Sequence, residues 1–409
     1  MQSSRSEAKG LSVRERDEAD AVRFAAASAA KMEVLLQRMI GDDAHARTSK
    51  AISDTVIAIG GAARVGLGFI ALALSAHEVL PLRDSHRRLE RLLRNPKLGL
   101  DCRGFSYVRH VLGSRTEALV ALDWTDFEHD KQTTLCAYLA TMHGRATPLW
   151  WKTVAKKGLT PEERIQVEDE VLTGLRNAMG PNVRVRLLCD RGFVDAERVE
   201  LWTAWGWNYV IRIRRNTMIT DATGKSKRAD EWLRGDGRAI RLAGATFTRS
   251  KQPIGCFVAV QQSRMKEPWL LICDAKVTTA RDAIDLYGMR FTTEETFRDQ
   301  QDPRFGLGLD YLHLKDPAKR DRLLMLAAYT QVLLTLLGAA SEASGLDVTL
   351  HPKGGVSQGK KRVYSLFRQG CIWFVLLPTL PEHLRARLLG AFKEILRQHQ
   401  LEDDLLAMV

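Results

Sequence analysis

The sequence predicts an α/β fold: a mixed β-sheet flanked by helices, with a strand-rich insertion and helical regions at both ends. Three observations support this prediction. Strand and helix signals alternate over residues 116–215, where the first three strand signals follow one another directly. Residues 216–275 carry closely spaced turn signals and short alternating apolar runs, which are typical of β-structure. On either side of these two segments the sequence favours helix.

The predicted sheet is built from short apolar runs. The first three strands are expected at 118–123, 135–142 and 146–154. A helix then begins near Thr160, because the sequence Thr-Pro-Glu-Glu places a proline and two acids in its first turn. The series continues with a strand at 183–190, a helix at 196–205 and a strand at 208–214.

The second half of the chain is predicted to start with β-structure and to end with helices. Within 216–275, the clearest strands are expected at 256–260 and 269–273. One long helix is predicted from residue 278 to about 301, a second over 321–337, and two more near the C-terminus. Residues 353–362 are rich in Gly and Lys and are predicted to form a mobile loop.

The N-terminal part contains a compact basic helix. Residues 1–60 favour helix, and the more apolar segment 62–80 ends at a Leu-Pro pair. In the segment 83–97, three leucines lie on one side of the predicted helix and Arg87, Arg91 and Arg94 lie on the other. An Asn-Pro pair ends this helix. Such a helix is either a solvated surface or a device that reads a DNA groove or binds phosphates.

Composition points to a polyanionic partner. The 409 residues include 61 Lys and Arg against 49 Asp and Glu, which gives a net charge of +12. Basic proteins of this kind bind nucleic acid by displacing its counterions, although many are simply soluble. The six cysteines include no Cys-x-x-Cys pair, which argues against a zinc ribbon and a disulfide framework and fits a reducing compartment. No signal peptide is evident, and the longest uncharged stretch near the N-terminus is too short to cross a bilayer, so we expect a cytoplasmic protein without a membrane partner.

Two acids follow apolar runs in the same way. Asp123 ends the run at 118–123, and Asp190 ends the run at 183–190. A carboxylate at the C-terminal end of a strand lies at the rim of the sheet, where the sites of α/β proteins form. Hard cations such as Mg²⁺ prefer carboxylate oxygens. An acid in this position can equally serve as a helix cap or an ion-pair partner.

A third acid lies on the predicted long helix. Tyr287, Arg290, Glu294, Arg298 and Gln301 are spaced so that they project from one helix face. The simple interpretation is an exposed face with ion pairs between successive turns. The same residues also describe a metal ligand flanked by phosphate-binding groups, because arginine binds phosphate oxygens in a bidentate manner. With a third acid, two metal ions roughly 3.5–4 Å apart could activate a phosphodiester.

These residues resemble the signature of a known family. Tyr287, Arg290 and Glu294 match the first three positions of the Tyr-Arg-Glu-Lys signature of the insertion-sequence-four family of bacterial DDE transposases. The segment 122–125 is similar to the family's first-aspartate motif, and 190–193 to its second. The pair at 297–298, the basic helix at 85–95 and the segment 365–368 with Gly370 are also similar to family motifs. The resemblance extends over roughly residues 60–375.

The resemblance implies an RNase H-like catalytic fold and a function. The function is DNA transposition: metal-dependent cleavage at the transposon ends and transfer of the freed 3′-OH into target DNA. The expected catalytic and metal-binding residues are Asp123, Asp190 and Glu294, with two Mg²⁺ or Mn²⁺ ions per active site. Asp123 and Asp190 would hold one ion, and Asp123 with Glu294 the other.

The resemblance also implies DNA contacts and partners. The partner is double-stranded DNA, in the form of terminal inverted repeats and target, bound by a homodimer in a synaptic complex in the bacterial cytoplasm with the nucleoid. Residues expected to contact DNA are Tyr287, Arg290, Arg298, Gln301, Trp269, Arg87, Arg88 and Arg91. Of these, Trp269 either stacks on a flipped base or is a buried strand residue.

One position departs from the signature. Its closing lysine is replaced by Gln301, which can donate a hydrogen bond to phosphate but carries no charge. Arg298, one turn earlier, can compensate. Two other functions therefore stay open: a catalytically impaired, transposase-derived DNA-binding protein, and an RNase H-like nuclease that does not transfer strands.

The predicted domain organisation has five parts. Residues 1–115 form a helical DNA-binding region, 116–215 the first part of the catalytic domain, and 216–275 the β-rich insertion. Residues 276–340 complete the catalytic domain with the helix that carries Glu294, and 341–409 form a helical C-terminal region.

Overall fold

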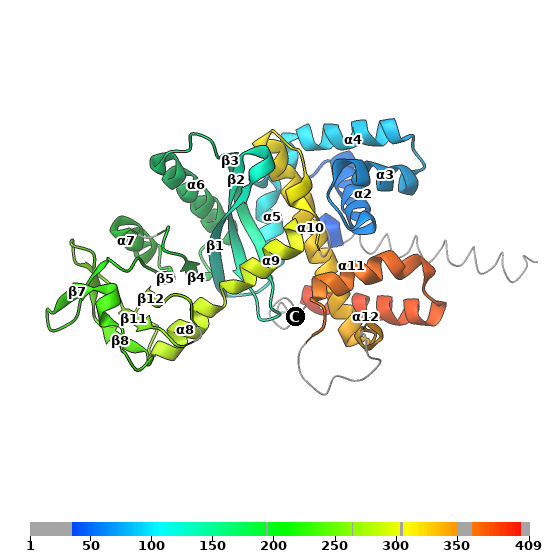
Figure 1. The fold of residues 1–409 in the computed structure, drawn as a ribbon. Coiled ribbons are helices and arrows are strands. Elements are labelled where there is room, and N and C mark those ends of the chain that lie inside the picture. Colours follow the sequence, from blue (N-terminus) through cyan, green and yellow to red (C-terminus); the bar gives the residue numbers. More distant parts are fainter. Residues whose placement is uncertain (1–34, 194, 264, 303–305, 351–361, 402–409) are drawn as a thin grey trace, which may run out of the picture.

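A mixed eight-stranded sheet forms the centre of the molecule in the computed structural model, which describes residues 35–193, 195–263, 265–302, 306–350 and 362–401 (Figure 1). The strand order is β3-β2-β1-β4-β5-β12-β11-β8. Helical regions precede and follow the sheet in sequence. The predicted α/β class is therefore confirmed, and the arrangement is consistent with an RNase H-like domain.

The first five strands of the sheet lie close to their predicted positions. Strands β1, β2 and β3 form an antiparallel meander, and β4 and β5 add to it in parallel on the β1 side. Their bounds are Glu117–Phe127, Gln132–Ala140, Ala146–Ala155, Arg184–Cys189 and Asn208–Arg212.

The segment predicted as an insertion is rich in strands, but its strands belong to two sheets. Strands β8, β11 and β12 (Ile240–Ala243, Cys256–Val260 and Trp269–Cys273) extend the main sheet in antiparallel fashion. A separate four-stranded sheet has the order β10-β9-β6-β7. Its strands are Met218–Thr220 (β6), Ser226–Arg228 (β7), Thr246–Phe247 (β9) and Gln252–Pro253 (β10). The five-part division of the chain stays a prediction.

Helices surround the sheet and form both ends of the described chain. They are α2 (Ala46–Ala62), α3 (Leu67–Glu78), α4 (Leu82–Arg94), α5 (Leu100–Leu112), α6 (Pro161–Met179), α7 (Ala196–Ala204), α8 (Ala280–Gly288), α9 (Phe291–Gln301), α10 (Pro317–Ala343), α11 (Leu366–Leu376) and α12 (Glu382–Leu401). Short 3₁₀ turns are found at Pro96–Leu98, Glu128–Asp130, Ala229–Trp232, Leu309–Tyr311, Asp347–Leu350 and Leu377–Thr379. The predicted start of α6 is confirmed, since Thr160 and Glu163 form a reciprocal capping box. The predicted loop at 353–362 lies almost wholly outside the described residues, as do the first 34 residues of the helical segment predicted over 1–60.

The single long helix predicted over 278–301 is wrong, because the segment forms two helices. Helix α8 ends at Gly288 and α9 begins at Phe291. At the junction, Arg290 N–H donates to the Tyr287 carbonyl and Thr293 N–H to the Arg290 carbonyl, so the α-helical hydrogen-bond spacing tightens by one residue. Glycine is a poor helix former, and Gly288 stands where the first helix stops. The break changes the direction of the side chains that follow it.

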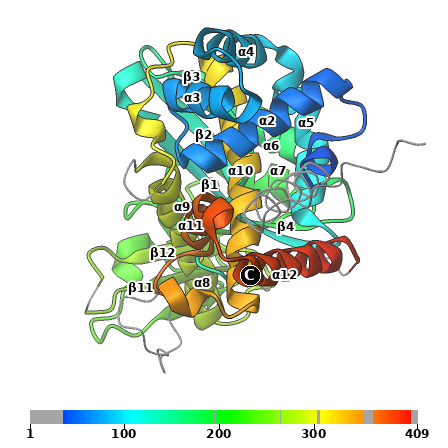
Figure 2. The ribbon, with the colours of Figure 1, turned by 90° about the vertical axis from the view of Figure 1, so that its right-hand side faces the viewer.

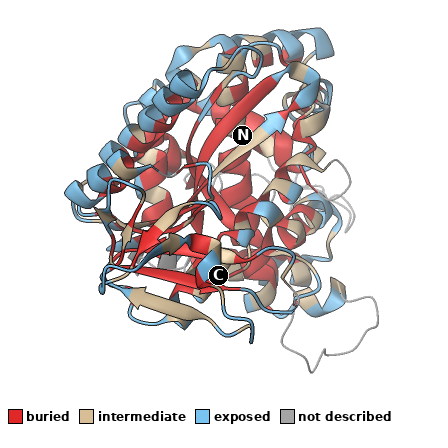
Figure 3. Cartoon of the chain, turned by 60° about the vertical axis from the view of Figure 1, so that its left-hand side comes forward, coloured by how far each residue is buried: buried red, intermediate tan, exposed pale blue. Residues whose placement is uncertain are grey.

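Helix α10 is the centre of the helical part. It packs against α2, α11, α12 and strand β3, and these helices lie around it in Figure 2. By length and composition α10 could cross a membrane, but 94% of its most apolar window is buried inside the protein. Burial of this degree is typical of the core helix of a globular protein. In Figure 3 the strands and helices at the centre of the molecule are coloured as buried, whereas much of the outer surface of the helices is exposed.

The two faces of the sheet pack against different partners. The larger hydrophobic cluster joins one face to the helical regions and includes Val120 and Leu122 of β1. A smaller cluster on the other face contains Ala121 and Leu188, packed with Tyr287 of α8. Successive residues of a strand point to opposite faces. Asp123 and Asp190, two positions after Ala121 and Leu188, therefore point toward α8 as well.

Candidate active site

Asp123 and Asp190 lie side by side where two parallel strands part. The pairing of β1 with β4 ends at Ala121 and Leu188, and the same register two residues further on brings Asp123 opposite Asp190. The prediction that Asp123 ends its strand is wrong, because β1 continues to Phe127 through its pairing with β2. What ends before Asp123 is the pairing with β4. Beyond Ala121 the edge of β1 that faced β4 is therefore unpaired, and both acids lie on the side of the sheet that carries α8 and α9.

Asp190 is held by groups from three elements. It is the first residue after β4, and its Oδ1 accepts a hydrogen bond of 2.8 Å from the backbone N–H of Arg191. The hydroxyl of Tyr287 donates to the same oxygen at 3.4 Å. The Arg212 guanidinium lies 3.9 Å from it and binds Glu267 on its other side. Sequence reasoning missed Arg212, although a basic residue at the end of the adjacent parallel strand was the available signal.

Arg290 lies between the three acids. Its Nη2 is 3.1 Å from Oδ2 of Asp123 and 3.9 Å from Oδ2 of Asp190, and its Nη1 is 3.7 Å from Oε1 of Glu294. The Arg290 side chain is only 9% exposed, while the Glu294 side chain is 56% exposed. The turn between α8 and α9 aims Arg290 inward and leaves Glu294 at the opening of the site. All three predicted acids therefore lie close to the same guanidinium, that of Arg290.

The site carries more negative charge than Arg290 can neutralise. Burial, with repulsion from Asp190 and Glu294, raises the pKa of Asp123 to about 6, against the opposing effect of Arg290. The carboxylates in turn raise the pKa of Arg290 above its ordinary value. The excess negative charge of Asp123, Asp190 and Glu294 would therefore favour the binding of a further cation among them.

The three acids fit a divalent metal by their chemistry, but they do not form a finished cage. Among the described residues, no group of three His, Cys, Asp or Glu side chains is arranged to hold a metal ion. The Arg290 guanidinium separates the acids, which explains this result. Carboxylate oxygens are the ligands that Mg²⁺ and Mn²⁺ take, and the shared contact with one guanidinium shows that the three can converge.

An aromatic group borders the acids. The Trp269 ring packs edge-on against Tyr287 with ring centroids 4.9 Å apart, and it stacks on Phe291 at 5.8 Å with 20° between the planes. Tyr287 is 1% exposed, whereas Phe291 is 42% exposed. Trp269 is thus neither fully buried nor isolated. Phe291, which sequence reasoning did not single out, is its exposed neighbour.

The last two predicted residues of the α9 face lie apart from the acids. Arg298 is 61% exposed and forms an ion pair of 3.0 Å with Glu295. The Gln301 side chain donates a hydrogen bond of 2.6 Å to the Thr125 hydroxyl, which ties the end of α9 to β1. Gln301 therefore has a structural partner where the family signature has a phosphate-binding lysine.

The basic helix α4 has two different arginine faces. Arg87 is 59% exposed, and Arg91 is also exposed. Arg88 instead points into the fold, where it forms ion pairs with the buried Asp54 and with Glu78. In this arrangement Arg87 and Arg91 are accessible to DNA, whereas Arg88 joins α4 to α2 and α3.

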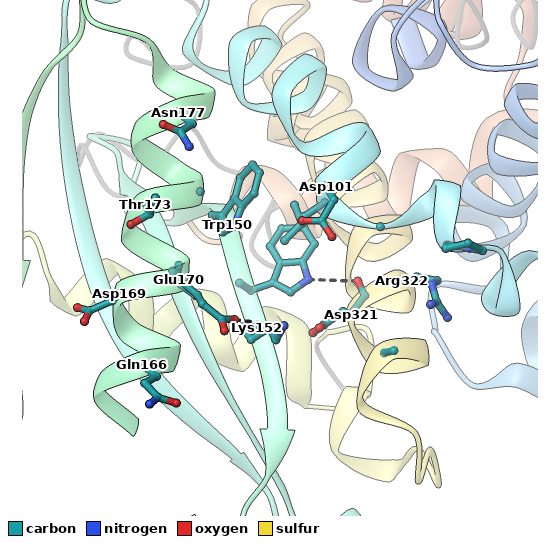
Figure 4. A pocket seen from close by; sticks show the side chains of 17 residues that line it. Asp101, Trp150, Lys152, Gln166, Asp169, Glu170, Thr173, Asn177, Asp321 and Arg322 are labelled. Atoms are coloured by element: carbon teal, nitrogen blue, oxygen red, sulfur yellow. Dashed lines mark hydrogen bonds and ion pairs between the residues drawn. The ribbon is translucent and has the colours of Figure 1, made fainter. Parts of the chain in front are cut away.

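A large cleft lies away from the acids. It has a volume of about 840 Å³ and none of the three acids lines it. Figure 4 shows its walls, α6 on one side and α5 with the start of α10 on the other, with Trp150 and Lys152 of β3 between them. Lys152 pairs with Glu170 at 3.3 Å, and Asp321 accepts a hydrogen bond from the Thr153 backbone N–H at 2.9 Å. The cleft is therefore separate from the carboxylate site.

Comparison with known families agrees with the geometry of the site. Residues 162–331 match the model of a family described as "Transposase DDE domain". The matched segment contains Asp190, Glu294 and the helices α8 and α9, and it begins after Asp123. The match supports a DDE transposase domain in this part of the chain. No curated protein sequence matches the chain.

Proposed function

We propose that this protein is a DNA transposase of the insertion-sequence-four type, which cleaves DNA at the ends of its element and joins the freed 3′-OH to target DNA. The observation that carries the proposal is the convergence of Asp123, Asp190 and Glu294 on Arg290 at the opening in the sheet. The family match over 162–331 supports a transposase function in coarser terms.

The three acids are the residues that would hold divalent metal ions, two for each active site. Bound there, Mg²⁺ or Mn²⁺ would activate water and stabilise the departing 3′ oxygen. Tyr287 and the Arg191 backbone N–H fix the orientation of Asp190. Because Glu294 is the most exposed of the three, its carboxylate has the greatest freedom to adjust its position.

Arg290 has two classes of possible partner. In the described arrangement it neutralises the carboxylates, and a DNA phosphate at the opening offers it another anion. Arginine suits both because its planar guanidinium binds carboxylate and phosphate in the same bidentate geometry. We propose that Arg290 transfers contacts from the acids to the scissile strand as DNA binds. Arg298 extends the basic surface by one helical turn.

The wider DNA contacts follow from the exposed groups. Arg87 and Arg91 on α4 are proposed to contact the terminal inverted repeat. Trp269, with Phe291 beside it, is proposed to stack on a base displaced near the cleavage point. A homodimer is expected to bring two ends together.

The proposal is tested by cleavage and strand-transfer assays on duplexes that carry the element's own ends, with Mg²⁺ or Mn²⁺. We expect Asp123→Asn, Asp190→Asn and Glu294→Gln each to lower the cleavage rate by at least about 100-fold, since each removes a ligand of the metal site. Glu295→Gln is the matched control, because Glu295 follows Glu294 in the chain but forms its ion pairs with Arg145 and Arg298 instead of Arg290. Its cleavage rate should stay within about threefold of the unmodified protein.

The same assay separates the alternatives. Cleavage that survives Asp123→Asn or Glu294→Gln would overturn the proposed site. Cleavage without joined products would indicate a nuclease. Specific binding to the ends without any cleavage would indicate a DNA-binding protein derived from a transposase, which is the outcome that Gln301 would favour.

A further inference from the structure

Two cysteines lie opposite each other in the main sheet. Cys256 begins β11 and Cys273 ends β12, and the two residues are direct partners in the antiparallel pairing of these strands. Both are free thiols. Directly opposite residues of an antiparallel pair have Cα atoms roughly 4.5–5.5 Å apart, and a disulfide needs roughly 4.4–6.8 Å. The two strands can therefore accept a disulfide between Cys256 and Cys273 without a rearrangement of the sheet.

The two thiols share one face of the sheet. Cys256 and Cys273 belong to the smaller hydrophobic cluster, on the side against which α8 packs (Figure 1). The chain is closely packed at this point, because a Cβ on the neighbouring Gly255 would lie 2.2 Å from backbone atoms of residues 274 and 275. This contact between backbones keeps the start of β11 against the end of β12, and with it the two cysteines in register.

The surroundings favour a thiolate at Cys256. A hydrogen bond from Cys273 lowers the pKa of the Cys256 thiol, and the Arg241 guanidinium on the edge strand β8 acts in the same direction. Burial and the Asp274 carboxylate oppose this effect, but Asp274 is itself paired with Arg186 at 3.2 Å. Among the described residues, no acceptor pairs with the buried Nε of Arg241, so this donor is available to a sulfur anion. The pKa of Cys273 is raised in turn, so one thiol of the pair ionises readily and the other keeps its proton.

A short link covers the thiols. Both cysteines are 0% exposed. Cys256 contacts the segment that connects β12 to α8, and among residues 275–279 of this segment only Val277 is buried. The Val277 carbonyl accepts hydrogen bonds from the Cys256 thiol at 3.6 Å and from Nη2 of Arg241 at 2.9 Å. A local opening of this link admits a molecule as small as a peroxide to the thiols.

We propose that Cys256 and Cys273 are a redox-active dithiol, which a peroxide oxidises to an intrachain disulfide between β11 and β12. The Cys256 thiolate takes one oxygen from hydrogen peroxide and becomes a sulfenic acid, while the other oxygen leaves as hydroxide and is protonated to water. The Cys273 sulfur then attacks the sulfenic sulfur and releases a second water. The two thiols lose two electrons and two protons, and one peroxide becomes two waters. In a reducing compartment the pair stays a dithiol until peroxide appears.

The disulfide would also change the contact that precedes α8. A sulfur in a disulfide has no proton to donate, so the Val277 carbonyl keeps Arg241 as its only donor of the two. Helix α8 begins three residues after Val277 and carries Tyr287, which donates to Asp190. Oxidation is therefore expected to loosen the start of α8. The oxidation itself needs neither DNA nor metal, so its test does not depend on the transposase function.

Peptide mapping of the full chain after treatment with hydrogen peroxide tests the dithiol. A Cys102→Ser background removes the exposed cysteine of the described residues, and with it cross-links between molecules through that residue. We expect a peptide pair linked through Cys256 and Cys273, which a dithiol reductant separates. Absence of the linked pair would overturn the proposal.

The other buried cysteines are internal controls in the same experiment: Cys136, Cys189 and Cys371. Burial raises the pKa of each of these thiols, so they react slowly with peroxide and should stay reduced. Oxidation of these three cysteines as fast as that of Cys256 would overturn the proposal, because it would reflect general unfolding instead of a reactive pair.

Serine variants test the roles of the two thiols. Cys273→Ser keeps a hydroxyl that can donate to Cys256 but removes the second sulfur, so peroxide should leave a sulfenic acid on Cys256 that dimedone traps. In Cys256→Ser, Cys273 should stay reduced under the same conditions. A Cys273 that reacts there as fast as Cys256 does in the unmodified protein would overturn the assignment of Cys256 as the attacking thiol. Thermal unfolding checks that both variants are folded.

Arg241→Gln tests the guanidinium. The rate of disulfide formation should fall by at least about fivefold, since less of Cys256 is ionised. The matched control is Arg238→Gln, three residues earlier, whose side chain is 81% exposed and lies 3.9 Å from Asp236. Its rate should equal that of the unmodified protein. Equal rates for both variants would contradict the contribution of Arg241.

Hydrogen exchange measures the effect on α8. Backbone amides at residues 280–284 should exchange at least about threefold faster in the oxidised protein than in the reduced protein. Cys256→Ser is the control, because its hydroxyl can still donate to the Val277 carbonyl and it cannot form the disulfide. Peroxide should leave its exchange unchanged. Equal exchange in the oxidised and reduced forms of the unmodified protein would overturn the coupling to α8.

Discussion

Arg290 and Arg88 show how one residue type serves two purposes in this protein. Both guanidiniums are largely buried and both lie against carboxylates. Arg290 faces three acids at an opening, where we propose that a DNA phosphate replaces them as its partner. Arg88 faces Asp54, whose side chain is 1% exposed, in the interior between helices. The Arg290 environment is open to a second anion, whereas the Arg88 ion pairs join α4 to α2 and α3.

Arg88→Ala is therefore expected to lower stability rather than DNA affinity. It removes one partner of the buried Asp54 carboxylate and leaves only Lys50, so the free energy of unfolding should fall by about 2 kcal/mol or more. Urea denaturation measures the effect. Arg87→Ala, on the exposed side of the same helix, should change the free energy of unfolding by less than about 0.5 kcal/mol. Equal effects of the two substitutions would contradict the inward position of Arg88.

Asp321 gives a prediction about pH. Burial raises its pKa to about 7, from an ordinary value of 3.8. Between these values the folded state keeps a proton that the unfolded state loses, so the stability contributed by Asp321 falls as the pH rises through this window. Asn keeps the acceptor for the Thr153 N–H and cannot ionise. Asp321→Asn should therefore stabilise the protein at pH 8 by on the order of 2 kcal/mol, and hardly at all at pH 4.

The measurement is thermal or urea unfolding at both pH values. Asp101→Asn, an exposed acid of the same cleft, is the control and should change stability by less than about 0.5 kcal/mol at either pH. A pH-independent effect of Asp321→Asn would show that folding does not raise the pKa of Asp321.

At the scale of the elements, α10 and α11 approach each other closely enough to bring their backbones into contact. A Cβ on Gly370 of α11 would lie 1.8 Å from the Leu334 carbonyl oxygen of α10, and one on Gly338 of α10 would lie 1.9 Å from the Leu366 carbonyl oxygen. Each helix thus contributes one glycine that lies directly against the backbone of the other helix. Ser365 caps α11 and its hydroxyl donates to Asp299 of α9 at 3.3 Å. The motif at 365–370 therefore connects the C-terminal helices to the helix that carries Glu294.

Gly370→Ala should force α10 and α11 apart. We expect the free energy of unfolding to fall by about 3 kcal/mol, because backbone atoms cannot yield as a flexible side chain does. Gly390→Ala on α12 is the matched control, since a Cβ there meets nothing within 4 Å. Replacing this exposed helical glycine should raise stability by about 0.5–1 kcal/mol. A mild effect of Gly370→Ala on the midpoint of chemical denaturation would show that the contact is looser than described.

At the scale of the whole molecule, the net charge of +12 predicts DNA binding that weakens steeply with salt. The slope of log affinity against log salt concentration counts the phosphates that are neutralised. Arg87→Ala and Arg91→Ala should each reduce the slope by about 0.9, if each residue contacts one phosphate. Arg88→Ala should leave it unchanged. Fluorescence anisotropy from 50 to 200 mM KCl on an end-bearing duplex measures the slopes. Unchanged slopes for Arg87→Ala and Arg91→Ala would exclude α4 from the DNA interface.

Much of the fold could be predicted from the sequence, because its signals are local. Apolar runs mark the strands β1 to β5, and Thr160 with Glu163 marks the start of α6. The break after Gly288 was missed, since the residues around it continue the helical spacing. The membership of β8, β11 and β12 in the main sheet was missed too, because strand pairing between distant segments leaves no local trace.

The candidate site, like the fold, could be predicted only in part from the sequence. The sequence by itself determined that Asp123, Asp190 and Glu294 form a candidate set, since their motifs and spacing identify them without any structure. Only the tertiary structure decided that Arg290 lies among them and that Gln301 binds Thr125. Periodicity fixes which residues share a face, but burial and ionic partners depend on what another element brings to that face, and this is a property of packing.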